Sequence, residues 1–346
     1  MEQNKYDIIK SKEIISACQK HGVDISAMIS YAKEQYGIMN EAIEGNNFSR
    51  NIMGMKIDER TKNILMAYSV LNPTNSDSAD RREDFKKFLC NNYINHYVSN
   101  ESIVEGVDLS HGANELKGLA EMYRYIYSPE VDERKNNHII LILQNLRKQL
   151  FRFSEYSEFA GEFRKCDAYI PGFSAELSSP GSIVPDLIKI DPEYQQLKKE
   201  AEECRLVNDP GRKIEFIKKT IIFQYYLLKI HPFSDGNGRT IRGLTNLLFE
   251  KAGIVPTYVN SEEKVFYKSL FEPINKKIED GIELEDTDFI DLHNFYEKKV
   301  CDSIMDVVVS PFSIALEEMN EEKKLKLAPP KSNLRNVFEI EDKKGQ

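Results

Sequence analysis

One stretch constrains the fold more than any other, because it joins a long apolar run to a loop dense in glycine. Residues 214–230, IEFIKKTIIFQYYLLKI, are apolar over a length that favours a buried helix, although the β-branched pair Ile221 and Ile222 leaves a strand open. Pro232 and the run 235–238, DGNG, follow directly and predict a tight loop. The sequence therefore places a sharp turn at the end of a buried segment.

A second helix is expected to begin at Arg239 and to be capped near Gly253. Its apolar residues fall at helical spacing, so one face of it should be buried. The residues expected on that face are Ile241, Leu244, Leu247 and Leu248. A glycine-bearing loop that opens onto a helix N-terminus makes an anion site, because backbone N–H groups converge there and the helix dipole favours negative charge. Phosphate groups are the natural ligands of such a site.

Four side chains around this loop suit phosphate chemistry. Arg239 and Arg242 lie in the first helical turn and can bind phosphate oxygens. Asp235 offers the hard carboxylate oxygen that a magnesium ion requires. His231 has an ordinary pKa of about 6.5, which suits a general base. Each element has a plain alternative, since a lone histidine is usually structural, DGNG is usually a turn and spaced arginines are usually solvated. Because all of these features occur together within residues 231–242, they favour a functional phosphate-binding site.

Helical patterns dominate the rest of the chain, with one short candidate strand at 166–174 and a polar, turn-rich linker at 72–82. The segments that carry the helical pattern are 11–36, 58–71, 83–98, 113–127 and 137–152. We therefore expect an all-α architecture in three parts. The parts are an N-terminal helical region over 1–98, a core over 99–310 and a charged tail over 311–346. The tail should be loose from about Glu317.

Composition excludes several functions. The net charge is −9 and basic residues are spread along the chain, which argues against a nucleic-acid binder. No run of eighteen apolar residues exists, so a membrane span and a membrane partner are not expected. The N-terminus lacks the apolar stretch of a secretory signal. Five cysteines stand singly without a CxxC pair, which fits a reducing compartment. These observations predict a cytoplasmic protein.

The segment HPFSDGNGRTIR, residues 231–242, matches a known signature at every defining position. It resembles the motif His-x-Phe-x-(Asp/Glu)-Gly-Asn-Gly-Arg-x-x-Arg of Fic-domain proteins. Three further segments are similar to the family: FAGEFR at 159–164, a flap hairpin at 167–183 and the helix at 266–274. The resemblance covers about 210 residues. It implies a Fic fold, which is a helical core with a small β-hairpin flap.

The resemblance implies an adenylyltransferase (AMPylator), which moves AMP from ATP to a Ser, Thr or Tyr hydroxyl of a target protein, or of the enzyme itself. His231 would be the catalytic base, Phe233 would anchor the loop in the core, and Asp235 would hold Mg²⁺ between the α- and β-phosphates. The ATP-binding residues would be Gly236, Asn237, Gly238, Arg239 and Arg242.

Within this set, Asn237 would reach the α-phosphate, Arg239 the β-phosphate and Arg242 the γ-phosphate. Relatives that phosphorylate, or that transfer phosphocholine, lack a glycine at the position of Gly236. The resemblance therefore favours AMP transfer, and it leaves removal of AMP open. It also leaves a homo-oligomer open.

Many Fic proteins carry an inhibitory motif, (Ser/Thr)-x-x-x-Glu-(Gly/Asn), whose glutamate pairs with the second arginine of the signature. Glu105, followed by Gly106, is the preferred candidate, and Glu44 is the second. Both depart from the motif, because the residue four positions before is Glu101 in one case and Asn40 in the other. For either glutamate, a solvated helix carboxylate remains the alternative. For the whole chain, the alternative is a nucleotide-sensing interaction protein that binds ATP without transferring it.

Overall fold

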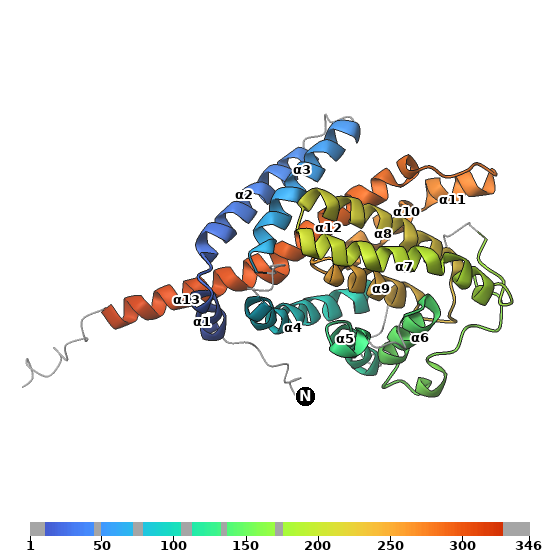
Figure 1. Ribbon diagram of the computed structural model, residues 1–346, viewed down its shortest axis with the longest axis horizontal. Coiled ribbons are helices and arrows are strands. Elements are labelled where there is room, and N and C mark those ends of the chain that lie inside the picture. The colour runs from blue at the N-terminus through green and yellow to red at the C-terminus, as the bar shows by residue number, and fades with distance from the viewer. Residues whose placement is uncertain are drawn as a thin grey trace, which may run out of the picture.

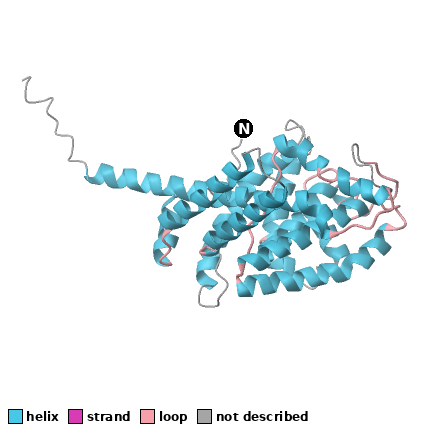
Figure 2. Ribbon diagram, turned by 90° about the horizontal axis from the view of Figure 1, so that it is seen from above, coloured by secondary structure: helices cyan, strands magenta, loops and turns pink. Residues whose placement is uncertain are grey.

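The computed structural model describes residues 11–44, 50–71, 79–104, 113–132, 137–169 and 176–327, and within these ranges every regular element is a helix (Figures 1 and 2). The first six α-helices are α1 (Ser11–Lys20), α2 (Ile25–Glu44), α3 (Arg50–Ser69), α4 (Ala79–Val104), α5 (Ala113–Ile126) and α6 (Ile139–Leu150). They are followed by α7 (Ile183–Val207), α8 (Pro210–Ile230), α9 (Asn237–Lys251), α10 (Lys264–Ser269), α11 (Glu272–Glu279), α12 (Ile290–Ile304) and α13 (Ser310–Leu327). The all-α prediction is confirmed.

Shorter helical turns join these helices. Four are 3₁₀ turns: η2 (Pro129–Asp132), η4 (Ser157–Phe159), η5 (Ser261–Glu263) and η6 (Asp286–Phe289). One π-helical turn, η7 (Met305–Val309), connects α12 to α13. No helix in the described ranges combines the length and the apolarity that a bilayer crossing requires.

The helix α9 lies at the centre of the fold. It packs against α5, α6, α7 and α8, and its side chains are buried on all faces. The four residues expected to be buried on this helix each have an exposed fraction of at most 1%. The preceding segment is α8, so the helical interpretation of residues 214–230 is correct and the strand alternative is not. Gly253 has φ of 71° just beyond the end of α9, as expected of a capping residue.

The hairpin between α7 and α8 is determined by local chemistry. Asn208 ends α7 in the left-handed region, which asparagine tolerates better than most residues. Asp209 then caps α8 by accepting a hydrogen bond from the Arg212 N–H at 3.0 Å, and Pro210 takes the first helical position. The buried Lys213 donates to Asn208 and to the carbonyl of Gly253, which ties the start of α8 to the end of α9.

The N-terminal helices join the same hydrophobic core as the rest of the chain, because α3 packs on α8 and α12, and α1 packs on α13. The expected helix over 11–36 is two helices, broken at Gly22 with φ of 62°. The expected division at 98/99 falls inside α4, which runs unbroken through it. Of the expected linker 72–82, residues 72–78 lie outside the described ranges and 79–82 begin α4.

Two other expectations concern the flap and the tail, and both can be compared with the structure. Residues 166–169 and 176–182 contain no strand, and 170–175, the middle of the expected hairpin, lie outside the described ranges. The tail was expected to be loose from Glu317, but α13 continues to Leu327 and projects from the body of the molecule (Figure 2). Its first turns are anchored, because Phe312 and Ala315 are fully buried.

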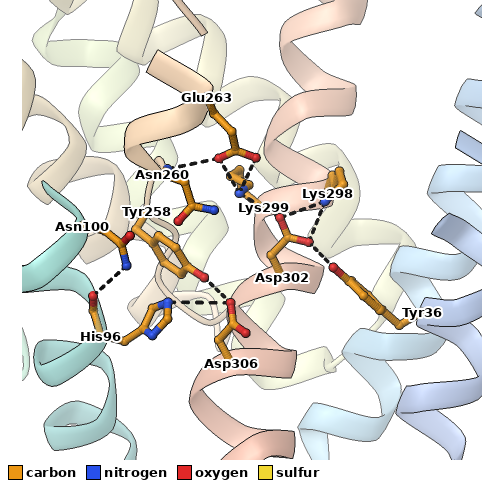
Figure 3. A network of polar contacts seen from close by, with 10 residues as sticks. All are labelled: Tyr36, His96, Asn100, Tyr258, Asn260, Glu263, Lys298, Lys299, Asp302 and Asp306. Carbon is orange, nitrogen blue, oxygen red and sulfur yellow. Dashed lines mark hydrogen bonds and ion pairs between the residues drawn. The ribbon is translucent and has the colours of Figure 1, made fainter. Parts of the chain in front are cut away.

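A polar network fixes α4 and α2 to the C-terminal helices (Figure 3). On α4, the imidazole of His96 lies 3.7 Å from the carboxylate of Asp306 in η7, which also accepts a hydrogen bond from Tyr258. On α2, the Tyr36 hydroxyl donates to Asp302 of α12 at 2.6 Å. Lys299 forms ion pairs with Asp302 at 2.8 Å and with Glu263 at 2.7 Å, and its ammonium group lies 5.4 Å from the centroid of the Tyr258 ring, which links the two groups. The position of α4 is therefore set by contacts far along the chain.

Candidate active site

His231 ends α8 in an unusual backbone conformation, with φ of 48° and ψ of 60°. Few residues other than glycine adopt this left-handed region, and such strain concentrates at functional sites. Its N–H donates to the Leu227 carbonyl at 3.1 Å. Burial, and then the charge of Arg164, lower the pKa of His231 to about 4. The imidazole is consequently neutral at pH 7 and able to accept a proton.

Arg164 holds the histidine in place from the 159–164 element. The guanidinium is buried, and its Nε donates to the His231 carbonyl at 2.7 Å. Its Nη1 donates to the Cys166 carbonyl at 2.9 Å and its Nη2 donates to the carbonyl of Ser178. One side chain thus links the base to both flanks of the flap segment.

The loop after the histidine is braced from inside. Phe233 is fully buried against Phe163, with ring centroids 5.4 Å apart, as expected of an anchor. The carboxamide of Asn237 accepts from the Phe233 N–H at 2.8 Å and donates to the Phe233 carbonyl at 2.6 Å. The side chain expected to reach a phosphate therefore also closes the loop. Its second amide hydrogen and its backbone N–H are the groups that could face an anion.

Gly236 caps α9 with φ of 77° and ψ of 11°. A Cβ on this residue would lie 2.6 Å from the Phe151 ring and 3.1 Å from a Leu150 methyl. Both the backbone conformation and the packing therefore require glycine. The first N–H groups of α9, on Asn237 and Gly238, have no helical carbonyl to pair with and converge at this end of the helix.

Asp235 has an exposed side chain, at 68%. One of its oxygens accepts from the Gly236 N–H at 2.6 Å and the other lies 3.6 Å from Arg239. No group of three or more His, Cys, Asp or Glu side chains that could hold a metal ion occurs in the described ranges. An accessible single carboxylate fits Mg²⁺, which commonly takes one or two protein carboxylates and completes its shell with phosphate oxygens and water.

Both arginines of α9 are buried, and each is paired with a glutamate from an earlier helix. Arg239 Nη1 donates to Glu115 of α5 at 2.5 Å. Arg242 makes a two-pronged contact with Glu101 of α4, from Nε at 2.6 Å and from Nη2 at 2.5 Å. Glu101 is completely buried and Glu115 is one-third exposed. The side chains best suited to bind phosphates are thus already occupied by carboxylates.

Comparison with known proteins agrees with this geometry. Residues 136–249 match the family model described as Fic/DOC family. The chain contains a Fic/DOC domain. A protein adenylyltransferase Fic from Aedes aegypti is 30% identical over 165 residues, which are 47% of this chain and 30% of that protein. Protein adenylyltransferase fic-1 from Caenorhabditis elegans is 27% identical over 164 residues, 45% of this chain and 28% of the relative.

Among solved structures, a Fic domain containing signaling protein from Bacteroides thetaiotaomicron resembles this fold with a TM-score of 0.51. Its sequence is 18% identical, and the match covers 72% of this chain and 97% of that one. At this identity the likeness concerns the fold alone. The chain spans less than a third of the length of each of these two curated relatives.

The glutamate that contacts the second arginine of the Fic/DOC loop is not one of the two expected from the sequence. Glu105 lies outside the described residues, as does the side chain of Glu44, so the structure places neither of them on Arg242. Glu101 occupies that position. It was missed because it fits the inhibitory motif poorly, with Tyr97 four positions before it and Ser102 after it.

Helical register explains why Glu101 is the residue that reaches the arginine. Tyr93, Tyr97 and Glu101 are spaced by four and so share one face of α4. The Tyr93 hydroxyl accepts from Asn246 of α9 at 3.1 Å, one helical turn beyond Arg242. The face of α4 that packs on α9 therefore includes Glu101. The structure shows which face of α4 meets α9, so the sequence alone does not single out Glu101.

Proposed function

We propose that this chain is a magnesium-dependent protein adenylyltransferase that transfers AMP from ATP to a hydroxyl group of a protein. The arrangement at the end of α8 carries the proposal. It combines a neutral His231, an exposed Asp235 and the glycine-lined N-terminus of α9 with two buried arginines. The names of the curated relatives support the same activity. The five cysteines are free, which is consistent with the cytoplasmic setting that we propose.

The proposed reaction uses few groups. His231 removes the proton from a Ser, Thr or Tyr hydroxyl, and the resulting oxygen attacks the α-phosphorus of ATP. A new P–O bond forms as the bond to the β-phosphate oxygen breaks, and pyrophosphate leaves. The N–H groups at the start of α9, with Arg239 and Arg242, stabilise the negative charge on the phosphates. Asp235 would hold Mg²⁺, which would supply further neutralisation of the phosphate charge.

We also propose that Glu101 restrains this activity. A carboxylate that accepts two hydrogen bonds from Arg242 competes with a γ-phosphate for the same guanidinium. Glu115 occupies Arg239 in the same way. The resting site would therefore bind ATP weakly until one or both glutamates withdraw. This proposal replaces Glu105 with Glu101 as the inhibitory residue, because Glu101 is the carboxylate seen on the arginine.

Labelled ATP tests the transfer reaction. Purified protein is incubated with ATP labelled at the α-phosphate or at the γ-phosphate, alone and with a cell lysate, in the presence of Mg²⁺. Transfer of the α-label to protein supports AMP transfer, whereas transfer of the γ-label indicates a kinase. ATP binding without transfer of either label, in the wild type and in Glu101→Ala, would favour the alternative of a nucleotide-sensing interaction protein.

A further inference from the structure

Arg147 of α6 lies directly behind the phosphate-binding loop, although it is not part of the signature segment. Its side chain is 7% exposed, and its Nε donates to the backbone carbonyl of Asp235 at 3.1 Å. Its Nη1 donates to the Phe159 carbonyl at 3.1 Å and to the carbonyl of Ala160. The guanidinium therefore bridges the loop and the 159–160 turn through backbone groups alone.

Two aromatic rings fix the orientation of this guanidinium. The Phe151 ring centroid lies 4.9 Å from its central carbon and the Phe233 ring centroid lies 4.8 Å from it. Planar stacking of this kind suits arginine and not lysine. Burial lowers the pKa of Arg147, while the neighbouring Asp235 opposes that effect. A buried cation that is held by two rings and three carbonyls has little freedom to move.

The carbonyl that Arg147 holds belongs to the peptide between Asp235 and Gly236. A peptide unit is planar, so fixing its C=O also fixes the direction of the Gly236 N–H. Peptides that precede a glycine at positive φ are prone to rotate as a unit, because glycine accepts either orientation. Without a partner for this carbonyl, the glycine-rich start of α9 would sample alternative arrangements of its N–H groups.

We infer that Arg147 is a positioning residue, which locks the Asp235–Gly236 peptide so that the start of α9 and the Asp235 carboxylate present one arrangement to the nucleotide. It touches no reacting atom, and it acts through the loop backbone. The catalytic part of this inference rests on the proposed adenylyl transfer, whereas the peptide geometry does not. Misplacement by about 1 Å of groups that stabilise a transition state typically costs about 100-fold in rate.

The test uses Arg147→Lys, which keeps the charge and loses the planar, multidentate contact. Activity is measured as α-label transfer in a Glu101→Ala background, which relieves the proposed restraint. We expect kcat to fall roughly 10- to 100-fold, with the KM for ATP changing by less than about threefold. The matched control is Arg152→Lys. Arg152 lies just after the end of α6 and its side chain is 58% exposed, so this variant should leave kcat and the KM for ATP unchanged.

A second readout is independent of catalysis. Selective ¹⁵N-glycine labelling gives amide signals for the 17 glycines. Added ¹³C-carbonyl labelling of aspartate singles out the two glycines that follow an aspartate, Gly236 and Gly281, and Gly281→Asn then identifies which signal belongs to Gly236. In Arg147→Lys we expect the Gly236 signal to shift, broaden or split while most glycine signals stay in place. An unchanged Gly236 signal, or full activity in Arg147→Lys, would overturn the inference. If neither the wild type nor Glu101→Ala transfers AMP, the proposed function fails. The Gly236 signal then still decides whether Arg147 locks the peptide.

Discussion

Replacing Glu101 with alanine should activate the enzyme, which is unusual for a change at an active site. In the structure, Glu101 is completely buried and holds Arg242 at 2.5 and 2.6 Å through both carboxylate oxygens. ATP can recruit Arg242 only by displacing this carboxylate. Competition of this kind corresponds to a coupling free energy of about 1–3 kcal/mol, or about 5- to 150-fold. We expect Glu101→Ala to raise automodification, and the apparent affinity for ATP, within that range.

The same substitution should lower stability in the absence of nucleotide. Removing one partner from a buried ion pair leaves an uncompensated charge, which typically costs about 3–5 kcal/mol. A γ-phosphate that occupies the vacated position would restore the pairing of Arg242. The rise in Tm on addition of ATP and Mg²⁺ should therefore be larger for Glu101→Ala than for the wild type, because linkage converts tighter binding into stability. Thermal scans with and without nucleotide measure this difference.

Controls separate the inhibitory contact from a general loosening of the helices. Glu121→Ala removes a carboxylate of α5 that pairs with Arg124 and Arg152 at the surface, and it should not activate. Arg242→Ala in the Glu101→Ala background should abolish most of the gain. A folded Glu101→Ala protein with wild-type transfer and wild-type ATP affinity would refute the competition argument. Activation by Glu105→Ala or Glu44→Ala instead would return the inhibitory role to the residues expected from the sequence.

Five further outcomes follow from the structure. His231→Ala should lower transfer by about 10²- to 10⁴-fold while ATP still binds, as measured by labelled transfer beside calorimetry. Because the pKa of His231 is lowered to about 4, kcat/KM should stay level from pH 8 to about 6 and fall only at more acid pH. A midpoint near the ordinary value of 6.5 would contradict the burial argument. Asp235→Asn should weaken Mg²⁺-dependent ATP binding, and equal transfer in EDTA would remove the metal from the mechanism. Glu115→Gln should strengthen ATP binding severalfold by releasing Arg239, with Glu121→Gln as its control, and unchanged affinity would show that this ion pair does not compete with ATP. Burial, together with Asp58, raises the pKa of Glu297 to about 9, so the folded chain keeps a proton that the unfolded chain releases near 4.5. Its free energy of unfolding should fall by up to about 1.4 kcal/mol per pH unit between those values, and denaturant titrations should find a flatter profile in Glu297→Gln.

Much of the fold could be predicted from the sequence. Along most of the chain, the spacing of the apolar residues and the positions of the turn-forming residues indicate the same helices. The helix before the loop was predicted as a buried helix, and the helix after it was predicted together with the residues of its buried face. Errors arose where tertiary contacts decide the outcome. The charged composition after Glu317 suggested a loose tail, yet α13 is anchored by Phe312 in the core. The break at Gly22 was missed because apolar spacing continues across it.

The functional site was also predicted only in part. Residues 231–242 are contiguous, so their order alone indicated a base, a metal ligand and an anion site. Contacts between distant segments had no such signal. Glu115 and Arg239 are 124 positions apart, and Arg147 and Asp235 are 88 positions apart. Asn237 shows a third case, since its carboxamide could face a phosphate or the loop backbone, and only the structure shows the second.

The two glutamates that close the site lie outside the part of the chain that matches the Fic/DOC model. That match begins at residue 136, whereas Glu101 is on α4 and Glu115 is on α5. A buried carboxylate can hold Arg242 only while its helix is fixed, and α4 is fixed by the network around His96 and Asp306 (Figure 3). We expect a partner or modification that displaces α4 to change the availability of Arg242. On the proposed function, chemistry and control therefore belong to different segments, and we expect regulation to be found in the helices before residue 136.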